Sequence, residues 1–376
     1  MSNFSKTYTL PFKFSIPNYT QDFLNQTSVF KRWLKFIKRY LYIVLKGQKN
    51  LEVFKISPNH KNILWINISA PSLGDSLMDL SSRVMLKGRN VDLFTDKKNA
   101  HIYTDDHIFN NIYTKTEGID SSEYDLVIID SYSSRSIDVK SKIAPITHFV
   151  GMFGYYNGPE VNRVLFSFHQ MNHLLGYIKT ENKINASAKV SMSISKTDQG
   201  AFEQIKLPDN YIAIVLGGEW DYRTYNKWDK VMTKILAKNK QTNIVFIGSS
   251  NAKDIAKNLL NQFSKNNVFD CVAKYSFNQT AQIIKKSKTL LCCDGGLMHA
   301  SNAVSTPIVP IFARLTPQMQ LTDATCAFPL FDKSDVNNIS VEAILEKYNE
   351  ASNFVGNHPQ GEKYHPHLNN HPFESR

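Results

Sequence analysis

The sequence predicts an α/β fold in which two doubly wound, Rossmann-like domains face each other across a cleft, preceded by a basic N-terminal extension. Short apolar runs of strand composition alternate with amphipathic stretches of helical length, a pattern typical of parallel sheets with helical crossovers. The alternation occurs in two series, separated by a polar stretch at residues 180–197 that lacks a strong period. A chain of 376 residues is long enough for two domains of ordinary size.

The first series predicts a domain over residues 61–180. Apolar runs indicate strands at residues 63–68, 91–95 and 125–129, and helical spacing indicates helices at residues 76–87 and 161–177. Residues 69–75 are expected to form the loop between the first strand and the first helix. Residues 148–158, which are rich in glycine and aromatic side chains, are expected to line the cleft.

The second series predicts a domain over residues 190–350. We expect its strands at residues 211–216, 243–247, 268–272, 289–293 and 307–312. We expect its helices at residues 228–237, 252–263, 277–286, 297–304 and 341–348. The polar, histidine-rich residues 357–376 are expected to form a disordered tail without a metal site.

Residues 1–60 are expected to form a basic, amphipathic extension, and its notable part is the segment from residue 30 to residue 48. Apolar side chains recur there at helical spacing, and most of the basic side chains fall on the other side of the helix. One interpretation is a helix that lies on an anionic membrane surface with its apolar face down. The other is a helix that packs on the first domain and exposes its basic face to solvent.

Composition limits the function further. The net charge of +11 indicates an anionic partner, such as an anionic lipid or a phosphorylated substrate. No nucleic-acid-binding motif accompanies this charge, so we expect no nucleic-acid partner. The sequence shows neither a secretory signal nor an apolar run of membrane-spanning length, and the four cysteines have no zinc-like spacing. These features predict a cytoplasmic protein with reduced thiols.

The segment from Leu290 to Phe312 carries the clearest functional pattern. It reads as a strand, a tight turn at Asp294, Gly295 and Gly296, a short helix and a second strand. Glycines in such a turn can adopt positive φ and let a ligand approach the backbone. Free N–H groups at the start of the helix favour an anion, most often a phosphate. An ordinary strand-to-helix turn is the alternative interpretation.

The order of residues in this segment resembles the nucleotide-sugar signature of glycosyltransferase family 9, the family of the bacterial ADP-heptose:lipopolysaccharide heptosyltransferases. The residues that carry the resemblance are Asp294, Gly295, Gly296, Met298, His299, Ala300, Ala303, Thr306 and Pro307. The resemblance extends over roughly residues 62–312 and is strongest from residue 277 onward. It implies two facing Rossmann-like domains, which is the GT-B architecture.

In this family, a Gly-Asp pair closes the first loop of the N-terminal domain, and its Asp is regarded as the catalytic base. The resemblance places that role on Asp75, in the stretch ILWINISAPSLGDSLMDL. A carboxylate between a strand end and a helix start could accept a proton from an attacking hydroxyl group. The alternative is that Asp75 only caps the helix that starts at Ser76. Ser69 and Ser72 are candidates for positioning an acceptor or binding its phosphate.

The donor side is predicted from the second domain. The family has a cation near a Trp that resembles Trp228, but its Lys normally stands where this chain has Asn226, so either Arg223 or Lys227 must neutralise the diphosphate. By resemblance, Asp294 binds sugar hydroxyls of the donor. The further candidates are Gly248 near the ribose or base, the backbone N–H groups of Gly296, Leu297 and Met298 at the phosphates, and His299 at a phosphate or packed in the helix.

The resemblance therefore implies an inverting glycosyltransferase that moves heptose, or a related sugar, from a nucleotide-sugar donor, ADP-heptose by the family, to a lipopolysaccharide core acceptor. No Asp-x-Asp pair stands at a strand end, so we expect catalysis without a metal or other cofactor. The expected location is the cytoplasm, peripheral on the inner face of the inner membrane. Two alternatives stay open: a nucleotide-sugar enzyme that does not transfer, such as an epimerase, and a non-catalytic nucleotide- or carbohydrate-binding protein of the same fold.

Overall fold

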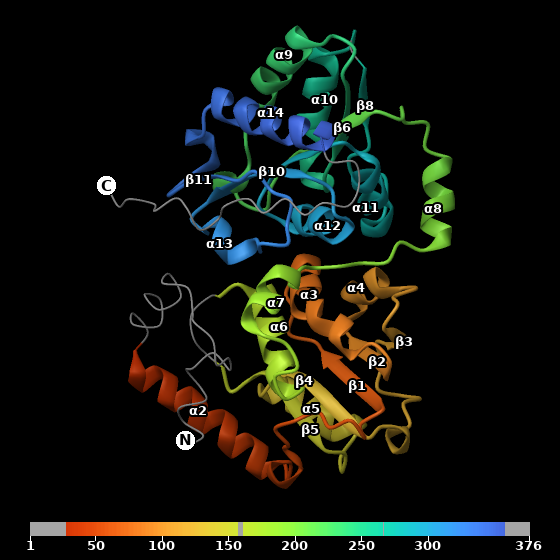
Figure 1. Ribbon diagram of the computed structural model, residues 1–376, viewed down its shortest axis with the longest axis vertical. Helices are drawn as coiled ribbons and strands as arrows, with labels where there is room; N and C mark the ends of the chain where they lie inside the picture. The colour runs from red at the N-terminus through yellow and green to blue at the C-terminus, as the bar shows by residue number, and fades with distance from the viewer. Residues whose placement is uncertain (1–27, 157–160, 266, 358–376) are drawn as a thin grey trace. The chain divides into compact units, whose positions relative to one another are not determined.

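The computed structural model describes residues 28–156, 161–265 and 267–357 (Figure 1). The chain divides between Ser193 and Ile194 into two compact units. This division falls inside the polar stretch where the sequence predicts the domain junction. Each unit contains one fully parallel sheet, which confirms the predicted class of two Rossmann-like α/β domains.

The sheet of the first unit has the strand order β3-β2-β1-β4-β5. Its strands are β1 (Asn62–Asn67), β2 (Asn90–Thr95), β3 (Phe109–Tyr113), β4 (Leu126–Ser131) and β5 (Phe149–Gly154). β1 and β4 are central and almost fully buried, which explains why their sequences are continuous apolar runs. The sequence analysis missed β3, which is largely exposed or half-buried, and β5, which carries two glycines.

Helices cover both faces of this sheet. One face is covered by α3 (Leu73–Asp79), the 3₁₀-helix η3 (Ser81–Leu86) and α6 (Arg163–Leu174), and α7 (Glu181–Ser187) packs on α6. The other face is covered by α5 (Ser134–Ile143). The short α4 (Lys97–Ala100) and η4 (His101–Tyr103) follow β2, and η5 (Ser121–Glu123) precedes β4.

Residues 28–60, which the sequence predicts as a separate extension, belong to the first unit. Helix α2 (Val29–Leu45) lies beside α5 (Figure 1), and Ile43 is fully buried in the core of the unit. After η2 (Lys49–Leu51), the N–H group of Val53 donates to the carbonyl of Phe149 at 2.9 Å, beside the edge strand β5. The alternative of a helix packed on the first domain therefore holds for one side of α2.

The sheet of the second unit has the strand order β11-β10-β9-β6-β7-β8. Its strands are β6 (Tyr211–Val215), β7 (Asn243–Ile247), β8 (Val268–Asp270), β9 (Leu290–Cys293), β10 (Ile308–Ala313) and β11 (Leu330–Asp332). Counted within the unit, this is the order 6-5-4-1-2-3 of a Rossmann fold, with the reversal between β6 and β9. The short edge strand β11 was not predicted from the sequence.

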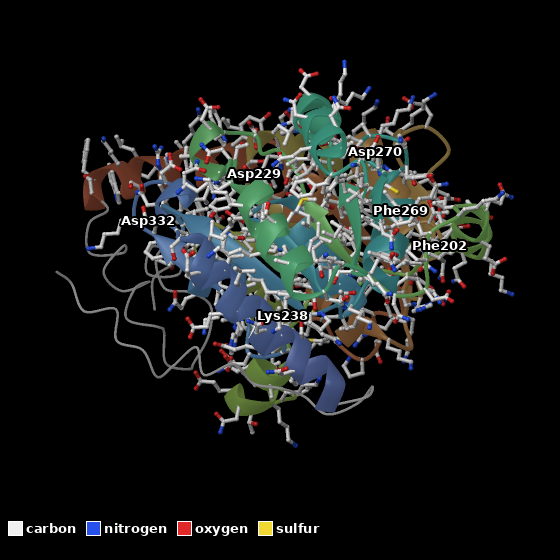
Figure 2. The ribbon with its side chains drawn as sticks, turned by 90° about the horizontal axis from the view of Figure 1, so that it is seen from above. Phe202, Asp229, Lys238, Phe269, Asp270 and Asp332 are labelled. Carbon is white, nitrogen blue, oxygen red and sulfur yellow. The ribbon has the colours of Figure 1, made fainter. Side chains whose placement is uncertain are left out.

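Two helical layers enclose this sheet (Figure 1). One layer consists of α9 (Trp228–Lys238), α10 (Lys253–Gln262) and α14 (Val341–Asn357), and the other of α11 (Phe277–Lys286) and α12 (Gly296–Val304), with α8 (Lys196–Glu203) against α11. Short helices α13 (Pro317–Gln320), η6 (Asp221–Arg223), η7 (Ser250–Ala252) and η8 (Val336–Asn338) lie in the connections. Figure 2 labels Asp229 and Lys238, which lie in the first and last turns of α9, where each charge complements the helix dipole.

Three local predictions were wrong in detail. The first helix of the first unit begins at Leu73 rather than Ser76, because Ser72 and not Asp75 is its N-cap. Gly295 has a φ of 167°, which is extended backbone, and Gly296 starts a helix, so the predicted positive φ values do not occur in this turn. The last helix, α14, extends to Asn357, and residues 358–376, the rest of the predicted tail, lie outside the described residues.

Candidate active site

The strand orders define where each unit can bind a ligand. In an open parallel sheet, the crevice lies at the carboxyl ends of the strands, where the strand order reverses. In the first unit this point lies between β1 and β4, and in the second between β6 and β9. The loop before Asp75 follows β1, and the loop that contains Arg223 and the turn at Asp294 follow β6 and β9. Asp75, Arg223 and Asp294 thus lie in loops that follow the strands at the two switch points.

Asp75 lies in the first turn of α3 and is held by the N-cap of that helix. The hydroxyl group of Ser72 donates to Oδ2 of Asp75 at 2.6 Å, and the backbone N–H of Asp75 donates back to the Ser72 hydroxyl at 3.2 Å. The Asp75 side chain keeps about a fifth of its surface exposed, at 21%. Ser72 therefore caps the helix and fixes the rotamer of Asp75, while the carboxylate stays accessible to solvent.

A second contact orients Asp75 from the other side. Arg163, at the start of α6, forms a two-pronged pair with Asp79, with Nε to Oδ1 at 2.8 Å and Nη2 to Oδ2 at 2.7 Å. Its Nη1 lies 3.3 Å from Oδ1 of Asp75. Burial raises the pKa of Asp79 despite the arginine. Arg163 thus joins the buried carboxylate of Asp79 to the partly exposed carboxylate of Asp75, a link that sequence reasoning missed because Arg163 is distant along the chain.

The backbone of the β1–α3 loop is fixed by Asp130 at the end of β4. Oδ2 of Asp130 accepts from the N–H groups of Ile68 at 2.9 Å and Ser69 at 2.8 Å, and Oδ1 accepts from the hydroxyl group of Ser136 at 2.6 Å. Asp130 itself is 2% exposed. The side chain of Ser69 is exposed beside this anchor, so a rigid loop presents Ser69 and Ser72 at the switch point.

In the second unit, the turn after β9 leads directly into α12. Gly295 is the N-cap of this nine-residue helix and offers no side chain to its first N–H groups. Among the described residues, the N–H groups of Gly296 and Leu297 have no backbone acceptor, whereas the N–H of Met298 donates to the Gly295 carbonyl at 3.1 Å. Met298 is also fully buried. The turn therefore presents two helix-terminal donors rather than the three predicted, and Met298 leaves the set.

The position of Gly295 is open. No heavy atom lies within 4 Å of the place where a Cβ atom would stand, and the backbone there is extended. Neither packing nor backbone conformation therefore demands a glycine at this position. A small residue there leaves room for a ligand to reach the N–H groups behind it.

Of the two candidate cations, Arg223 is the one at this turn. It ends η6, and its Nη1 lies 3.4 Å from Oδ2 of Asp294, with side-chain exposures of 20% and 5%. Lys227 instead donates through Nζ to the backbone carbonyl of Asn337 and is the N-cap residue of α9. Trp228 is buried and stacks edge-on with Tyr225 at 5.0 Å, so this part of the predicted motif anchors α9 in the core.

A second arginine, which sequence reasoning missed, adjoins Arg223. Arg314 follows β10 with a φ of 67°, and its guanidinium lies 3.7 Å from the centre of the Tyr222 ring. The guanidinium of Arg223 lies 5.6 Å from the same ring. Nε of Arg314 donates to the Ser334 carbonyl at 3.4 Å. Two cations therefore share one aromatic ring near the carboxyl ends of the strands, an arrangement that favours an anionic ligand.

The local packing of Gly248 and His299 gives each of them a role in the structure of the second unit. Gly248 follows β7 with a φ of 154°, and a Cβ atom there would lie 2.5 Å from the carbonyl oxygen of Leu216. Glycine is therefore required for β6 and β7 to approach at their ends. The His299 side chain is buried within α12, at 4% exposure.

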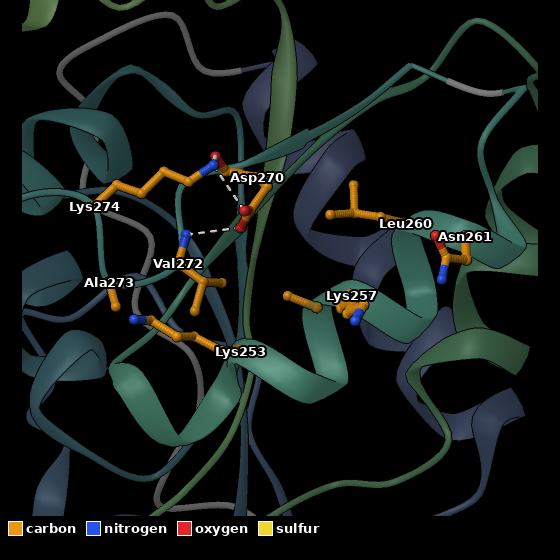
Figure 3. A pocket seen from close by; sticks show the side chains of 9 residues that line it. Lys253, Lys257, Leu260, Asn261, Asp270, Val272, Ala273 and Lys274 are labelled. Carbon is orange, nitrogen blue, oxygen red and sulfur yellow. Dashed lines mark hydrogen bonds and ion pairs between the residues drawn. The ribbon is translucent and has the colours of Figure 1, made fainter.

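A distinct cavity of about 430 Å³ lies between α10 and β8, at the outer edge of the second sheet (Figure 3). Lys253 and Lys257 line it, and Lys274 is paired with Asp270 at 2.7 Å. None of the predicted donor-binding residues lines this cavity. It is therefore a feature separate from the switch point.

Among the described residues, no group of three His, Cys, Asp or Glu side chains is placed to hold a metal ion. The four cysteines are free, and burial raises the pKa of Cys271 to about 11 and of Cys293 and Cys326 to about 12. At neutral pH these three thiols are protonated and hence poor nucleophiles. In the described part of the chain, no helix is both long and apolar enough to cross a membrane.

Comparison with known proteins agrees with the fold and the turn. Residues 155–330 match the family model described as glycosyltransferase family 9 (heptosyltransferase). This match covers the α12 turn, both candidate cations and Arg314. The family match and the shared fold together support the class of glycosyltransferases. The family match, which covers just under half of the chain, agrees with the resemblance to glycosyltransferase family 9 that the turn predicted.

Solved structures share this fold at low sequence identity. A family 9 glycosyl transferase from Veillonella parvula is 14% identical, with a TM-score of 0.65 over 80% of this chain and 99% of that chain. The E. coli ADP-heptose lps heptosyltransferase II is 15% identical, with a TM-score of 0.63 over 77% and 98%. The E. coli heptosyltransferase WaaC with ADP is 16% identical, with a TM-score of 0.57 over 77% and 98%. A search of curated proteins finds no match to the sequence.

Proposed function

We propose that the protein is an inverting, metal-independent glycosyltransferase that moves heptose, or a closely related sugar, from ADP-heptose to a lipopolysaccharide core precursor. The observation that carries the proposal is the open turn at Gly295, with two helix-terminal N–H groups behind it and Arg223 beside it. A nucleoside diphosphate is the leaving group that such a cradle suits. Solved members of the family are described with ADP and with ADP-2-deoxy-2-fluoro heptose, which supports an adenine nucleotide donor.

In the proposed reaction, an acceptor hydroxyl oxygen attacks the anomeric carbon of the donor sugar. The bond from that carbon to the diphosphate oxygen breaks on the opposite side, so the anomeric configuration inverts. The proton of the hydroxyl group passes to the carboxylate of Asp75, and the electron pair of the broken bond leaves with the diphosphate. Ser72 and Arg163 hold the Asp75 carboxylate in one orientation for this step.

The negative charge of the leaving group is met by fixed donors in the second domain. The N–H groups of Gly296 and Leu297 point from the helix start, and the guanidinium groups of Arg223 and Arg314 supply two positive charges around Tyr222. Donors that are already in place cost no reorganisation as charge develops. These groups together do the work for which metal-dependent transferases use a divalent cation, which is the basis for proposing metal independence. Asp294 is proposed to bind donor sugar hydroxyls once the donor displaces Arg223 from it.

The proposed setting is the cytoplasmic side of the inner membrane, where a lipid-linked, phosphorylated core acceptor would be met. The net charge of +11 supports an anionic acceptor and an anionic surface. Ser69 and Ser72 are retained as acceptor-binding candidates, Ser69 through its exposed hydroxyl group and Ser72 mainly through its hold on Asp75.

Asp75→Asn tests the proposed chemistry. This variant keeps a hydrogen-bonding side chain beside Ser72, so the N-cap and the fold persist, but an amide cannot accept the proton. We expect transfer of heptose to the acceptor, measured by release of ADP, to fall about 10²–10⁴-fold, as for loss of a general base. Affinity for ADP, measured by calorimetry, stays at the wild-type value because the donor cradle belongs to the other domain.

Ser69→Ala serves as the matched control at the same loop. It removes an exposed hydroxyl group, leaves the Asp130 contacts to the backbone intact, and is expected to change the acceptor KM rather than kcat. Wild-type turnover in Asp75→Asn would remove the assigned base. Retention of the anomeric configuration in the product, read by NMR, would contradict the inverting mechanism.

A further inference from the structure

Helix α2 presents apolar side chains on the side that it does not use for packing. Six large hydrophobic side chains of this helix are 42–82% exposed: Phe30, Trp33, Leu34, Leu41, Val44 and Leu45. They are six of the eleven exposed large hydrophobic side chains among the described residues. Single exposed hydrophobic residues need no explanation, but a contiguous set on one helix marks an interaction surface.

The geometry of the helix separates this set from the side that packs on the first unit. Phe36, Tyr40 and Ile43 pack in the core at i, i+4 and i+7. Leu34 and Leu41 each precede a packed residue by two positions, a rotation of about 200° in an α-helix, and so lie on the opposite side. The sequence left two interpretations of this helix open, packing on the first domain and binding to a membrane surface. In the structure, one apolar face of α2 packs on the first unit and a second apolar face is exposed.

The packed side is firmly attached, so the exposed face is held at a fixed place on the unit. Arg39 donates to the carbonyl of Tyr156 at 2.8 Å, and Tyr42 donates to Asp138 at 2.7 Å. Lys46 pairs with Asp138 at 2.7 Å. Docking through the opposite face would therefore carry the whole first unit to the partner.

The charges beside the exposed face identify the partner. Lys31, Lys35 and Lys38 are all exposed and follow one another along the flank of the apolar face. The segment from Lys31 to Asn50 holds seven basic residues and no acidic one. Apolar side chains bordered by lysines match the interface of an anionic bilayer, because the acyl chains contact the apolar side chains and the phosphate headgroups pair with the lysines.

We infer that α2 is an in-plane anchor that docks the protein on an anionic membrane surface through its Phe30, Leu34, Leu41 and Leu45 face, with Lys31, Lys35 and Lys38 at the headgroups. This surface lies outside residues 155–330, which match the family, so it is a feature that the family match does not explain. The inference is independent of the sugar and the acceptor, because vesicle binding needs neither.

The test is co-sedimentation of the full-length protein with vesicles of phosphatidylcholine, with and without phosphatidylglycerol. We expect binding only when phosphatidylglycerol is present, weakening as salt rises. The double variant Leu34→Glu/Leu41→Glu should lose at least about tenfold in vesicle affinity. Each Lys-to-Gln substitution at Lys31, Lys35 or Lys38 should cost about fivefold. Ile146→Glu is the matched control, because Ile146 is 81% exposed in the same unit but lies outside α2, and it should bind like the wild type.

Trp33 provides an independent readout of the same contact. It is 42% exposed on α2, whereas Trp65 and Trp228 are buried at 1% and 2%, and the remaining tryptophan, Trp220, is 55% exposed in the second unit. A blue shift of tryptophan emission on vesicle addition should be lost in Trp33→Phe. Two results would overturn the inference directly: no binding of the full-length protein to anionic vesicles, or a loss of vesicle affinity in Ile146→Glu equal to that in the double variant. The inference would also fall if the exposed face of α2 were covered by a second copy of the chain. That case would show as a dimer that Leu34→Glu/Leu41→Glu dissociates without any change in vesicle binding.

Discussion

Removal of the Arg223 side chain tests whether this arginine is the cation that meets the diphosphate. Arg223→Ala deletes a guanidinium that lies 3.4 Å from Asp294 at the carboxyl end of β9. Loss of one fixed donor to a developing anion costs about 10²–10³ in kcat. The same substitution takes a cation from a carboxylate that is 5% exposed, which we expect to lower the free energy of unfolding by about 1–3 kcal/mol. That loss is well below the total stability of an ordinary domain, so the variant stays folded.

Two further variants separate charge from geometry and Arg223 from Lys227. Arg223→Lys keeps the charge but loses the planar fork, so its turnover should lie between that of the wild type and that of Arg223→Ala. Lys227→Ala removes a bond to the Asn337 carbonyl on the α9 side of the loop. It should lower stability by about 1 kcal/mol and leave turnover unchanged.

The assay is steady-state release of ADP in the presence of donor and acceptor, with urea unfolding of each variant in parallel. The reasoning predicts a large loss of kcat in Arg223→Ala at saturating donor and none in Lys227→Ala. If Arg223→Ala turned over at the wild-type rate while Lys227→Ala did not, the assignment of the two cations would be reversed.

Three other predictions follow from the same structure. Gly295→Thr should fold with unchanged stability, because space is open at this position and Thr is a competent N-cap. The Thr side chain should lower the affinity for ADP, measured by calorimetry, at least about tenfold, and wild-type affinity would place the diphosphate elsewhere. Arg314→Gln should raise the donor KM about 5- to 30-fold, since a charged hydrogen bond is lost, with little change in melting temperature, and an unchanged KM would remove Arg314 from the donor site. Burial lowers the pKa of Lys140 to about 8 in the folded protein, below its unfolded value of 10.5. The unfolded state therefore binds more protons between pH 8 and 10.5, and the free energy of unfolding should rise with pH there by no more than about 3 kcal/mol. Urea unfolding of Lys140→Met should lack this rise, and equal slopes in the two proteins would contradict the burial argument.

The central strands of both sheets could be predicted because a strand that is buried on both faces consists of consecutive apolar residues. β1, β6 and β9 are of this kind, and their ends were placed within one or two residues. Edge strands β3 and β11 carry polar or half-buried residues and give no such signal. The start of α3 was misplaced because only Asp75 was considered as its N-cap, whereas Ser72 is an equally good N-cap residue and the hydrogen bonds of the structure select it.

The candidate site was predictable only where its residues are neighbours along the chain. The turn at Asp294 and the loop at Asp75 are local motifs, and the sequence indicated both. Arg163 and Arg314 reach their places through tertiary packing, one against Asp79 and the other against Tyr222, and neither contact leaves a local pattern. The choice between the two cations likewise needed the structure, because it depends on which side chain turns toward β9.

A crystal structure of the protein with ADP tests the central claim most directly. The account predicts the diphosphate within hydrogen-bond distance of the N–H groups of Gly296 and Leu297, with the Arg223 guanidinium on its oxygens and released from Asp294. A diphosphate held instead by Lys253 and Lys257 in the cavity between α10 and β8, with the Gly295 turn empty, would contradict it.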